Sequence, residues 1–262
     1  MSKTRIDALL IERGLFESRS RAAAAVIAGE VYLGLDGERA SKPGQLVGAD
    51  IDVSVVDAPR YVSRGGTKLA NALEALSFTV TGRSCLDIGA STGGFTDCLL
   101  QRGAASVAAV DVGYGEFDWR LRQDPRVSVI ERTNARNLRP EDLPFEPELA
   151  VIDLSFISLE KVFPAVARVL APEGDMLAMV KPQFEVGRDR VGRGVVHSAE
   201  HRREALVAVG EAARSVGFRP RAFVPSGLPG PKGNLETFLW CDRGEGGADD
   251  LDLYAEALRA DP

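Results

Sequence analysis

The sequence predicts an α/β fold, in which a Rossmann-like sheet with helices on both faces follows a small α+β module. From about residue 65, short apolar stretches alternate with helical patterns, which favours a parallel sheet covered on both faces. The earlier residues instead predict two helices and then short strands. We therefore expect two domains, 1–58 and 65–244, joined by a linker at 59–64 and followed by an acidic tail at 245–262.

The first module is predicted from its helix caps and turns. A helical pattern from Ile6 ends at Gly14, and Ser18 is a suitable N-cap for a second helix that stops at Gly29. Turn signals then separate short strands. The strands are expected at 31–33 and 51–55, and the turns at 36–37 and 42–44.

The second domain is predicted as strands that alternate with helices. Its last two strands are joined by a Gly/Pro-rich segment, so we expect an antiparallel hairpin at the sheet edge. A short amphipathic helix is also possible in the tail, at 251–258. The strands are expected at 84–88, 106–111, 126–130, 150–153, 176–181, 219–224 and 235–241, and the helices at 65–76, up to Leu100, and at 159–170 and 199–216.

The composition is that of an ordinary globular protein, with 45% hydrophobic and 27% charged residues among 262. It excludes a disordered chain and a disulfide scaffold. No apolar run approaches the roughly 18 residues of a membrane-spanning helix, and the first residues do not suggest a secretory signal. Three scattered cysteines, Cys85, Cys98 and Cys241, indicate a reducing compartment and no metal site. We expect a cytoplasmic monomer without a membrane partner.

Basic side chains gather near the start of the second helix. Arg5, Arg19 and Arg21 are expected there, where free backbone N–H groups also meet phosphate, and Lys42 can join them from a turn. The net charge of −6 does not exclude an RNA partner, because residues 242–262 hold seven acids and two bases and the rest carries only −1. The segments 5–10, 18–22, 28–31 and 42–44 resemble the S4-type RNA-binding domain, which implies that these four side chains contact RNA.

A glycine-rich turn connects the first strand of the second domain to the next helix. It reads Asp87-Ile88-Gly89-Ala90-Ser91-Thr92-Gly93-Gly94-Phe95, and its glycines let a ligand approach the backbone. It lacks the second glycine of the dinucleotide fingerprint and the Gly-Lys-Ser/Thr of a P-loop. Asp87 suits a cationic or amino-acid ligand, and Asp111, after the next strand, suits a ribose diol. The pairing indicates S-adenosylmethionine, with the turn near the methionyl part and Asn134 at the adenine edge.

Four charged residues lie at the ends of predicted elements. Lys68 begins a helix, Asp153 and Lys181 end the fourth and fifth strands, and Glu236 begins the last strand. Ligands of open α/β sheets bind beyond the carboxyl ends of the strands. An antiparallel last strand starts at that same edge, so the four side chains can converge there.

These four residues resemble the Lys-Asp-Lys-Glu tetrad of the FtsJ-like ribose 2′-O-methyltransferases, and the turns 87–90 and 93–95 resemble their cofactor motif. With the S4-type module in front, the chain apart from its acidic tail is similar to the TlyA family of rRNA 2′-O-methyltransferases, also labelled hemolysins. The resemblance implies a class I methyltransferase sheet and S-adenosylmethionine as cofactor. It also implies a cytidine ribose of 16S or 23S rRNA, or both, in ribosomal subunits as the methyl acceptor.

The residue types of the tetrad suit this chemistry. A ribose hydroxyl is a poor nucleophile near neutral pH, so it needs a base or a cation that stabilises the developing alkoxide. A second cation and partial burial can lower the pKa of a lysine from about 10.4. We assign Lys181 to the 2′-oxygen, as general base or oxyanion stabiliser, and Asp153 to orient it and face the sulfonium. Lys68 and Glu236 would position the ribose.

The segment 184–198 follows Lys181 and mixes glycines with basic residues. Arg188, Arg190 and Arg193 suit phosphate contact or a flap over the substrate, and a mobile solvated loop is the alternative.

Other activities fit less well. Methylation of an exocyclic amine favours Asn/Asp-Pro-Pro-Tyr/Phe after the fourth strand, where this chain has Asp153-Leu154-Ser155-Phe156. Covalent methylation of a pyrimidine carbon needs a cysteine at the same edge, where none is expected. Pseudouridine synthases also follow S4-type modules but need no S-adenosylmethionine turn. A non-catalytic ribosome-binding factor would not need the tetrad, and no spanning helix supports a membrane-lytic hemolysin.

Overall fold

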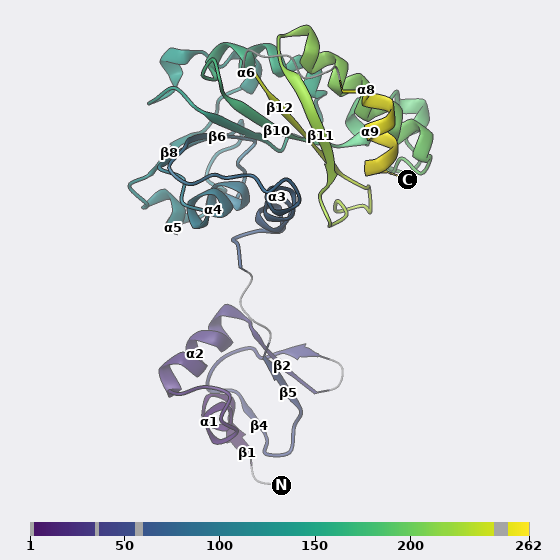
Figure 1. The fold of residues 1–262 in the computed structure, drawn as a ribbon. Coiled ribbons are helices and arrows are strands. Elements are labelled where there is room, and N and C mark those ends of the chain that lie inside the picture. The colour runs from purple at the N-terminus through teal and green to yellow at the C-terminus, as the bar shows by residue number, and fades with distance from the viewer. Residues whose placement is uncertain (1–2, 35–36, 56–59, 244–250, 262) are drawn as a thin grey trace. The chain divides into compact units, whose positions relative to one another are not determined.

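The computed structural model describes residues 3–34, 37–55, 60–243 and 251–261. The chain divides into two compact units, residues 1–60 and 61–262 (Figure 1). The second unit begins earlier than the expected linker implies. Tyr61 is buried, the Val62 N–H donates to Asp97 at 2.9 Å, and the first helix of the unit already begins at Arg64.

The first unit is built from two small antiparallel sheets and a pair of short helices. The Ser18 hydroxyl accepts from the Arg21 N–H and so caps the second helix, which ends at Gly29 in the left-handed region at φ +74°. These caps confirm the expected limits of the second helix, whereas the first helix ends at Glu12, before the expected Gly14. The expected turn at Asp36 lies outside the described residues. The elements are β1 (Lys3–Arg5), α1 (Ile6–Glu12), α2 (Arg19–Ala28), β2 (Val31–Leu33), β3 (Glu38–Arg39), β4 (Leu46–Gly48) and β5 (Val53–Val55), with β1 on β4 and β2 between β3 and β5.

The second unit contains a seven-stranded sheet in the order β11-β12-β10-β9-β6-β7-β8. Its described strands run parallel except β12, which lies antiparallel between β10 and β11. The expected hairpin is therefore confirmed, and with it the α/β fold. The strands are β6 (Ser84–Ile88), β7 (Ser106–Val110), β8 (Val127–Ile130), β9 (Leu149–Ile152), β10 (Asp175–Val180), β11 (Arg219–Pro225) and β12 (Thr237–Asp242).

Helices cover both faces of this sheet (Figure 1). Successive strand residues point to opposite faces, so Leu86 and Ile152 enter the core under α6 and α8, whereas Cys85 and Val151 enter the core under α3 and α4. Strands that are buried on both faces have nearly continuous apolar sequences, which is why the sequence predicts them well. The helices are α3 (Arg64–Ala75), α4 (Gly94–Gln101), α5 (Trp119–Arg122), α6 (Phe163–Val169), α7 (Pro182–Glu185), α8 (Ala199–Ser215) and α9 (Leu253–Ala260).

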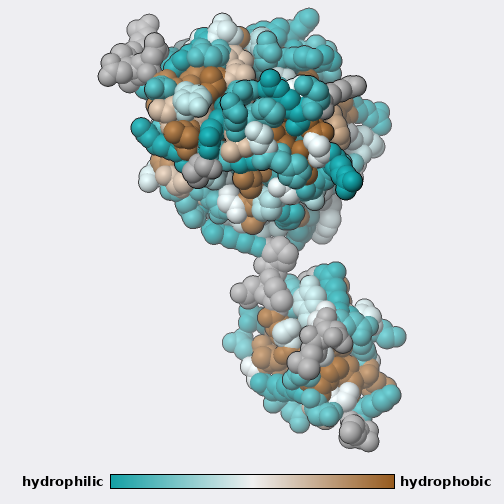
Figure 2. All heavy atoms as spheres, turned by 90° about the vertical axis from the view of Figure 1, so that its right-hand side faces the viewer, coloured by the Kyte–Doolittle hydropathy of each residue, from teal (hydrophilic) through white to brown (hydrophobic). Residues whose placement is uncertain are grey.

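Two helical segments differ from expectation. The predicted helix at 159–170 is a 3-10 turn, Leu159–Lys161, followed by α6, which has Pro164 in its first turn. The expected tail contains α9, and this helix packs on α8 through Leu253 and Ala257. Among the described residues, none of the helices has both the length and the apolar character needed to cross a membrane. Figure 2 shows one face of the protein, where hydrophilic side chains surround smaller hydrophobic areas.

Candidate active site

Three strand ends bring charged residues to one edge of the sheet. Lys181 follows the last residue of β10, and Glu236 precedes the first residue of β12. Val180 and Thr237 are register partners in this antiparallel pair, so Lys181 and Glu236 lie opposite each other. Asp153 follows β9, the parallel neighbour of β10 on its other side. The antiparallel strand thus brings Glu236 to the edge at which the parallel strands end.

Lys181 is held between two acceptors. Its Nζ lies 2.5 Å from Asp153 Oδ1 and donates to Ser155 Oγ at 3.1 Å. The lysine side chain is 12% exposed and the Asp153 side chain 25%. The ammonium is therefore fixed in direction, and the pair remains reachable from solvent at the sheet edge. Ser155 was not among the predicted site residues, although its place two residues after Asp153 is a usable signal.

Lys68 and Glu236 form a second, deeper pair. Lys68 lies on α3 and its Nζ donates to Glu236 Oε2, and both residues are buried. Gly230 packs directly against the same carboxylate. There is no room for a side chain at this position, since a Cβ would lie 2.4 Å from Glu236 Oε1. The hydrogen bonds and ion pairs of the described residues thus join the predicted tetrad as two lysine–carboxylate pairs rather than as one cluster.

Asp87 is the most deeply buried acid of the site. Its Oδ2 accepts from the Thr96 N–H at 2.9 Å and from the Thr96 hydroxyl at 2.7 Å. Its Oδ1 is buried with no hydrogen-bond partner among the described residues. Burial raises the pKa of Asp87 to about 7, and the nearby carboxylates Asp153 and Asp111 act in the same direction. Asp87 therefore has an acceptor atom to offer a cationic ligand.

The glycine-rich turn needs its glycines for two different close approaches. Gly89 has φ +85°, and a Cβ there would lie 2.2 Å from the carbonyl oxygen of Asp153. Gly93 has φ +95°, and a Cβ there would lie 2.6 Å from a methyl of Leu121 on α5. Phe95, which was predicted as a cofactor contact, packs its ring against Phe238 in the core at 5.8 Å between centroids.

A cavity of about 190 Å³ lies beside this turn and gathers several predicted cofactor residues. Asp111 stands in its wall, where its carboxylate accepts from the backbone N–H groups of Ser91 at 2.8 Å and Gly113 at 2.6 Å. Asn134 also lines it, but its side-chain oxygen is engaged by Arg136. The wall further includes Gly89, Val110, Val112, Thr133, Ala135, Leu154, Ser155, Ile157 and Val162. Ser155 therefore borders both the cavity and the Lys181 ammonium.

The cysteines do not supply a nucleophile to this edge. All three are buried, and burial raises the pKa of the Cys85 thiol to about 12 and that of Cys241 as well. A thiol in such surroundings carries little thiolate. The three cysteines therefore pack as small apolar groups.

One buried acid, Asp7, brings together two of the four residues of the first unit that the sequence predicts to contact RNA. Asp7 accepts from Arg5 at 2.8 Å and lies 3.2 Å from Arg19, while both arginine side chains remain about half exposed. The Arg5 guanidinium holds the pKa of Asp7 well below its usual range. Arg21 pairs instead with Glu17 at 2.7 Å, and Lys42 is exposed. Arg5 and Arg19 therefore form the fixed part of the predicted basic surface.

The segment 184–198 is tied down at several points. Arg190 pairs with Glu204 on α8, and Arg193 is exposed in a tight turn at φ +51°. The Val196 N–H donates to the side chain of Asn234 at 3.0 Å. The side chain of Arg188 lies outside the described residues. Asn234, a buried residue that sequence reasoning missed, thus anchors the segment next to Glu236.

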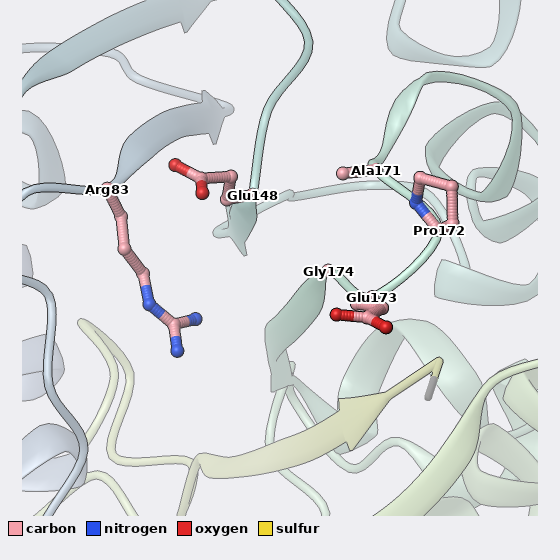
Figure 3. Close-up of a pocket in the computed structure, with 6 residues that line it drawn as sticks. All are labelled: Arg83, Glu148, Ala171, Pro172, Glu173 and Gly174. Atoms are coloured by element: carbon pink, nitrogen blue, oxygen red, sulfur yellow. The ribbon is translucent and has the colours of Figure 1, made fainter. Parts of the chain in front are cut away.

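A cavity of about 460 Å³ lies elsewhere (Figure 3). It is lined by Arg83, Glu148 and residues 171–174, which directly precede β6, β9 and β10. Since parallel strands begin at one edge and end at the other, this cavity lies at the edge opposite the two lysine–carboxylate pairs. It does not belong to the candidate site.

The comparisons with known proteins agree with this geometry. A family model described as FtsJ-like methyltransferase matches residues 61–243. The chain is 50% identical over 241 residues to the 16S/23S rRNA (cytidine-2′-O)-methyltransferase TlyA of Mycobacterium tuberculosis, which covers 91% of this chain and 89% of that protein. A solved structure from Streptococcus thermophilus, described as a candidate hemolysin, has a TM-score of 0.75, 39% identity and coverage of 99% and 96%.

A candidate S-adenosylmethionine-dependent methyltransferase from Listeria monocytogenes shares the fold of the second unit. Its TM-score is 0.52 at 15% identity, and it covers 70% of this chain and 100% of that one. The family match spans most of the second unit, including both lysine–carboxylate pairs and the glycine-rich turn. The chain belongs to the FtsJ-like methyltransferase family.

Proposed function

We propose that this chain transfers a methyl group from S-adenosylmethionine to the ribose 2′-hydroxyl of a cytidine in rRNA. The observation that carries the proposal is the position of Lys181, held by Asp153 and Ser155 beside a cavity that the glycine-rich turn borders. The name of the 50% identical Mycobacterium relative supports both the ribose position and the rRNA acceptor.

The residues around the turn fit the proposed cofactor. The unpartnered Asp87 Oδ1 suits a cationic group, and Gly89 of the turn lines the neighbouring cavity. The cavity of about 190 Å³ is smaller than the roughly 300–1,000 Å³ that encloses a whole drug-sized ligand, so it suits the nucleoside half. When bound, S-adenosylmethionine supplies an electrophilic methyl group on a positively charged sulfur.

Lys181 acts on the acceptor oxygen in this proposal. A lysine ammonium has three donors. One faces Asp153 and a second Ser155, which leaves the third for the 2′-oxygen of the ribose. A cation fixed there stabilises the negative charge that develops on the oxygen as the hydroxyl proton passes to solvent water, which reaches this edge of the sheet. Asp153 keeps the lysine in place, and the buried Lys68–Glu236 pair supports the adjacent strand end.

The first unit would hold the RNA. Arg5 and Arg19 present half-exposed guanidinium groups in a geometry fixed by Asp7, as phosphate contacts require. We propose that this unit is an S4-type RNA-binding domain and that the substrate is rRNA within ribosomal subunits. The exposed Lys42 and the segment that carries Arg190 and Arg193 are further proposed contacts.

The test is transfer of labelled methyl from S-adenosylmethionine to separated small and large ribosomal subunits, followed by mapping of the product. Wild type is compared with Lys181→Ala and with Lys161→Ala, a matched change at an exposed lysine in the 3-10 turn before α6. Label on a cytidine 2′-oxygen that is lost only in Lys181→Ala supports the proposal. Label on a base, or undiminished label in Lys181→Ala, overturns it.

A further inference from the structure

Asn234 joins two segments next to the candidate site. Its side-chain oxygen accepts from the Val196 N–H at 3.0 Å, and its amide donates to the carbonyl oxygen of Gly194 at 2.7 Å. Its own carbonyl oxygen accepts from the Gly230 N–H at 2.8 Å. The residue is 3% exposed, so these bonds are shielded from water. Asn234 therefore fastens the segment before α8 to the loop that leads into β12.

A second residue pair fixes the same segment from the other side. The Arg202 guanidinium donates to both carboxylate oxygens of Asp261, at 2.5 and 2.8 Å, and both side chains are almost fully buried. The remaining Arg202 nitrogen donates to the carbonyl oxygens of Val196 and His197, at 3.3 and 2.9 Å. A bidentate arginine–carboxylate pair is rigid. Asp261 thus sets the direction from which Arg202 holds the segment.

Asp261 is itself anchored through α9. Leu253 on this helix packs into the groove left by Gly210 on α8, where a Cβ would lie 2.8 Å from its methyl group. The carbonyl oxygen of Asp261 also accepts from Arg203 Nε at 2.6 Å. The position of Asp261 therefore depends on a helix outside the sheet, which lies beyond the expected catalytic domain at 65–244.

Asn234 and Asp261 both lie close to Glu236. Asn234 precedes it by two residues, and Gly230, which Asn234 binds, closes on Glu236 Oε1. Asp261 and Glu236 line the same cavity of about 230 Å³. We infer that Asp261 is a positioning residue of the reaction: through Arg202, Val196 and Asn234 it sets the place of Glu236 and hence of Lys68. This inference rests on the proposed function, and it adds α9 to the elements that position the active-site residues.

The experiment compares Asp261→Asn with Arg259→Ala. The first change removes the charge that orients Arg202. The second removes an exposed charge on the same helix, where Arg259 pairs with Glu256. The kcat and the KM for S-adenosylmethionine are measured with ribosomal subunits, and amide hydrogen exchange is followed at Val196 in the free protein. Asp261→Glu tests rescue, because it retains a bidentate acceptor.

We expect Asp261→Asn to lower kcat about tenfold and to speed exchange at Val196 at least tenfold, with the KM for S-adenosylmethionine within twofold. Arg259→Ala should match wild type, and Asp261→Glu should recover most of the loss. Unchanged kcat and exchange in Asp261→Asn, or an equal loss in Arg259→Ala, would overturn the inference. A wild type that labels no rRNA would refute the proposed function alone, because exchange at Val196 still decides whether Asp261 holds the segment.

Discussion

Lys181 and Glu236 lie opposite each other across the β10–β12 pair, yet each forms its ion pair with a different residue. Lys181 pairs with Asp153 at the open edge, and Glu236 pairs with Lys68 in the interior. The two pairs therefore differ in what a substitution removes. The outer pair can be altered with little cost to folding, whereas each member of the inner pair leaves a buried charge when its partner is removed.

Lys181→Ala should lower kcat for methyl transfer by about 10² to 10³-fold, the usual loss when one donor that stabilises a developing oxyanion is removed. The affinity for S-adenosylmethionine should change less than twofold, because the lysine does not line the cofactor cavity. Rapid-quench kinetics and calorimetric titration measure the two quantities. A large loss of cofactor affinity with unchanged kcat would show that Lys181 acts in binding instead.

Lys68→Ala should lower the free energy of unfolding by about 3–5 kcal/mol, because it leaves Glu236 buried and unpaired. The double variant Lys68→Met, Glu236→Leu should regain most of this stability but not the activity. Urea denaturation of the single variants Lys68→Met and Glu236→Leu and of the double variant gives the coupling. Additive losses in the double variant would contradict a direct pairing of the two charges.

Asp87 should make stability depend on pH in an unusual direction. Its pKa is raised to about 7 from an ordinary value near 4, so the folded chain binds the proton more tightly than the unfolded chain does. The stabilising contribution of this proton is complete below about pH 4 and is lost as the pH rises through about 7. Asp87→Asn should therefore raise the melting temperature relative to wild type more at pH 8 than at pH 5. The same gain at both pH values would contradict the raised pKa.

Gly89→Ala should weaken both the proposed cofactor site and the fold. The control is Gly115→Ala, because Gly115 has nearly the same φ, +82° against +85°, but has no atom within 4 Å of an added Cβ. Both variants should lose about 1–2 kcal/mol of stability from the left-handed backbone. Gly89→Ala should lose more, because its Cβ would lie 2.2 Å from the carbonyl oxygen of Asp153. Only Gly89→Ala should also lose cofactor affinity, since its methyl group displaces the backbone of Asp153. Equal cofactor affinity in the two variants would argue against this close approach.

Arg5→Ala and Arg19→Ala should each weaken binding to ribosomal RNA and reduce its salt dependence by roughly one counterion. Cofactor affinity should remain unchanged, because neither residue belongs to the methyltransferase unit. Filter binding over a range of salt concentrations measures both effects. If the salt dependence is that of wild type in both variants, these arginines do not contact phosphate.

The sequence was sufficient for the strands of the seven-stranded sheet and for the shared edge of the tetrad residues. It was not sufficient for β1, β3 and β4 of the first unit or for the pairing within the tetrad. Apolar runs identify buried strands, and residues at strand ends must share an edge, so Asp153, Lys181 and Glu236 were predictable. The pairing of each lysine with its carboxylate depends on the register of β10 with β12 and on the position of α3 relative to the sheet. Neither can be recognised from a short stretch of sequence. Asn234 and Asp261 were missed for the same reason, since their partners lie far away in the chain.

The reversed direction of β12 also has a consequence for how the protein is made. Lys68 is synthesised early, and its counter-ion arrives only with the last strand of the sheet. Until that strand inserts, β10 and β11 lack the neighbour that separates them, and Lys68 has no anion to accompany it into the interior. A nascent chain that has not yet released β12 from the ribosome is therefore both incompletely folded and inactive. Completion of the sheet and the pairing of Lys68 with Glu236 arrive in a single step.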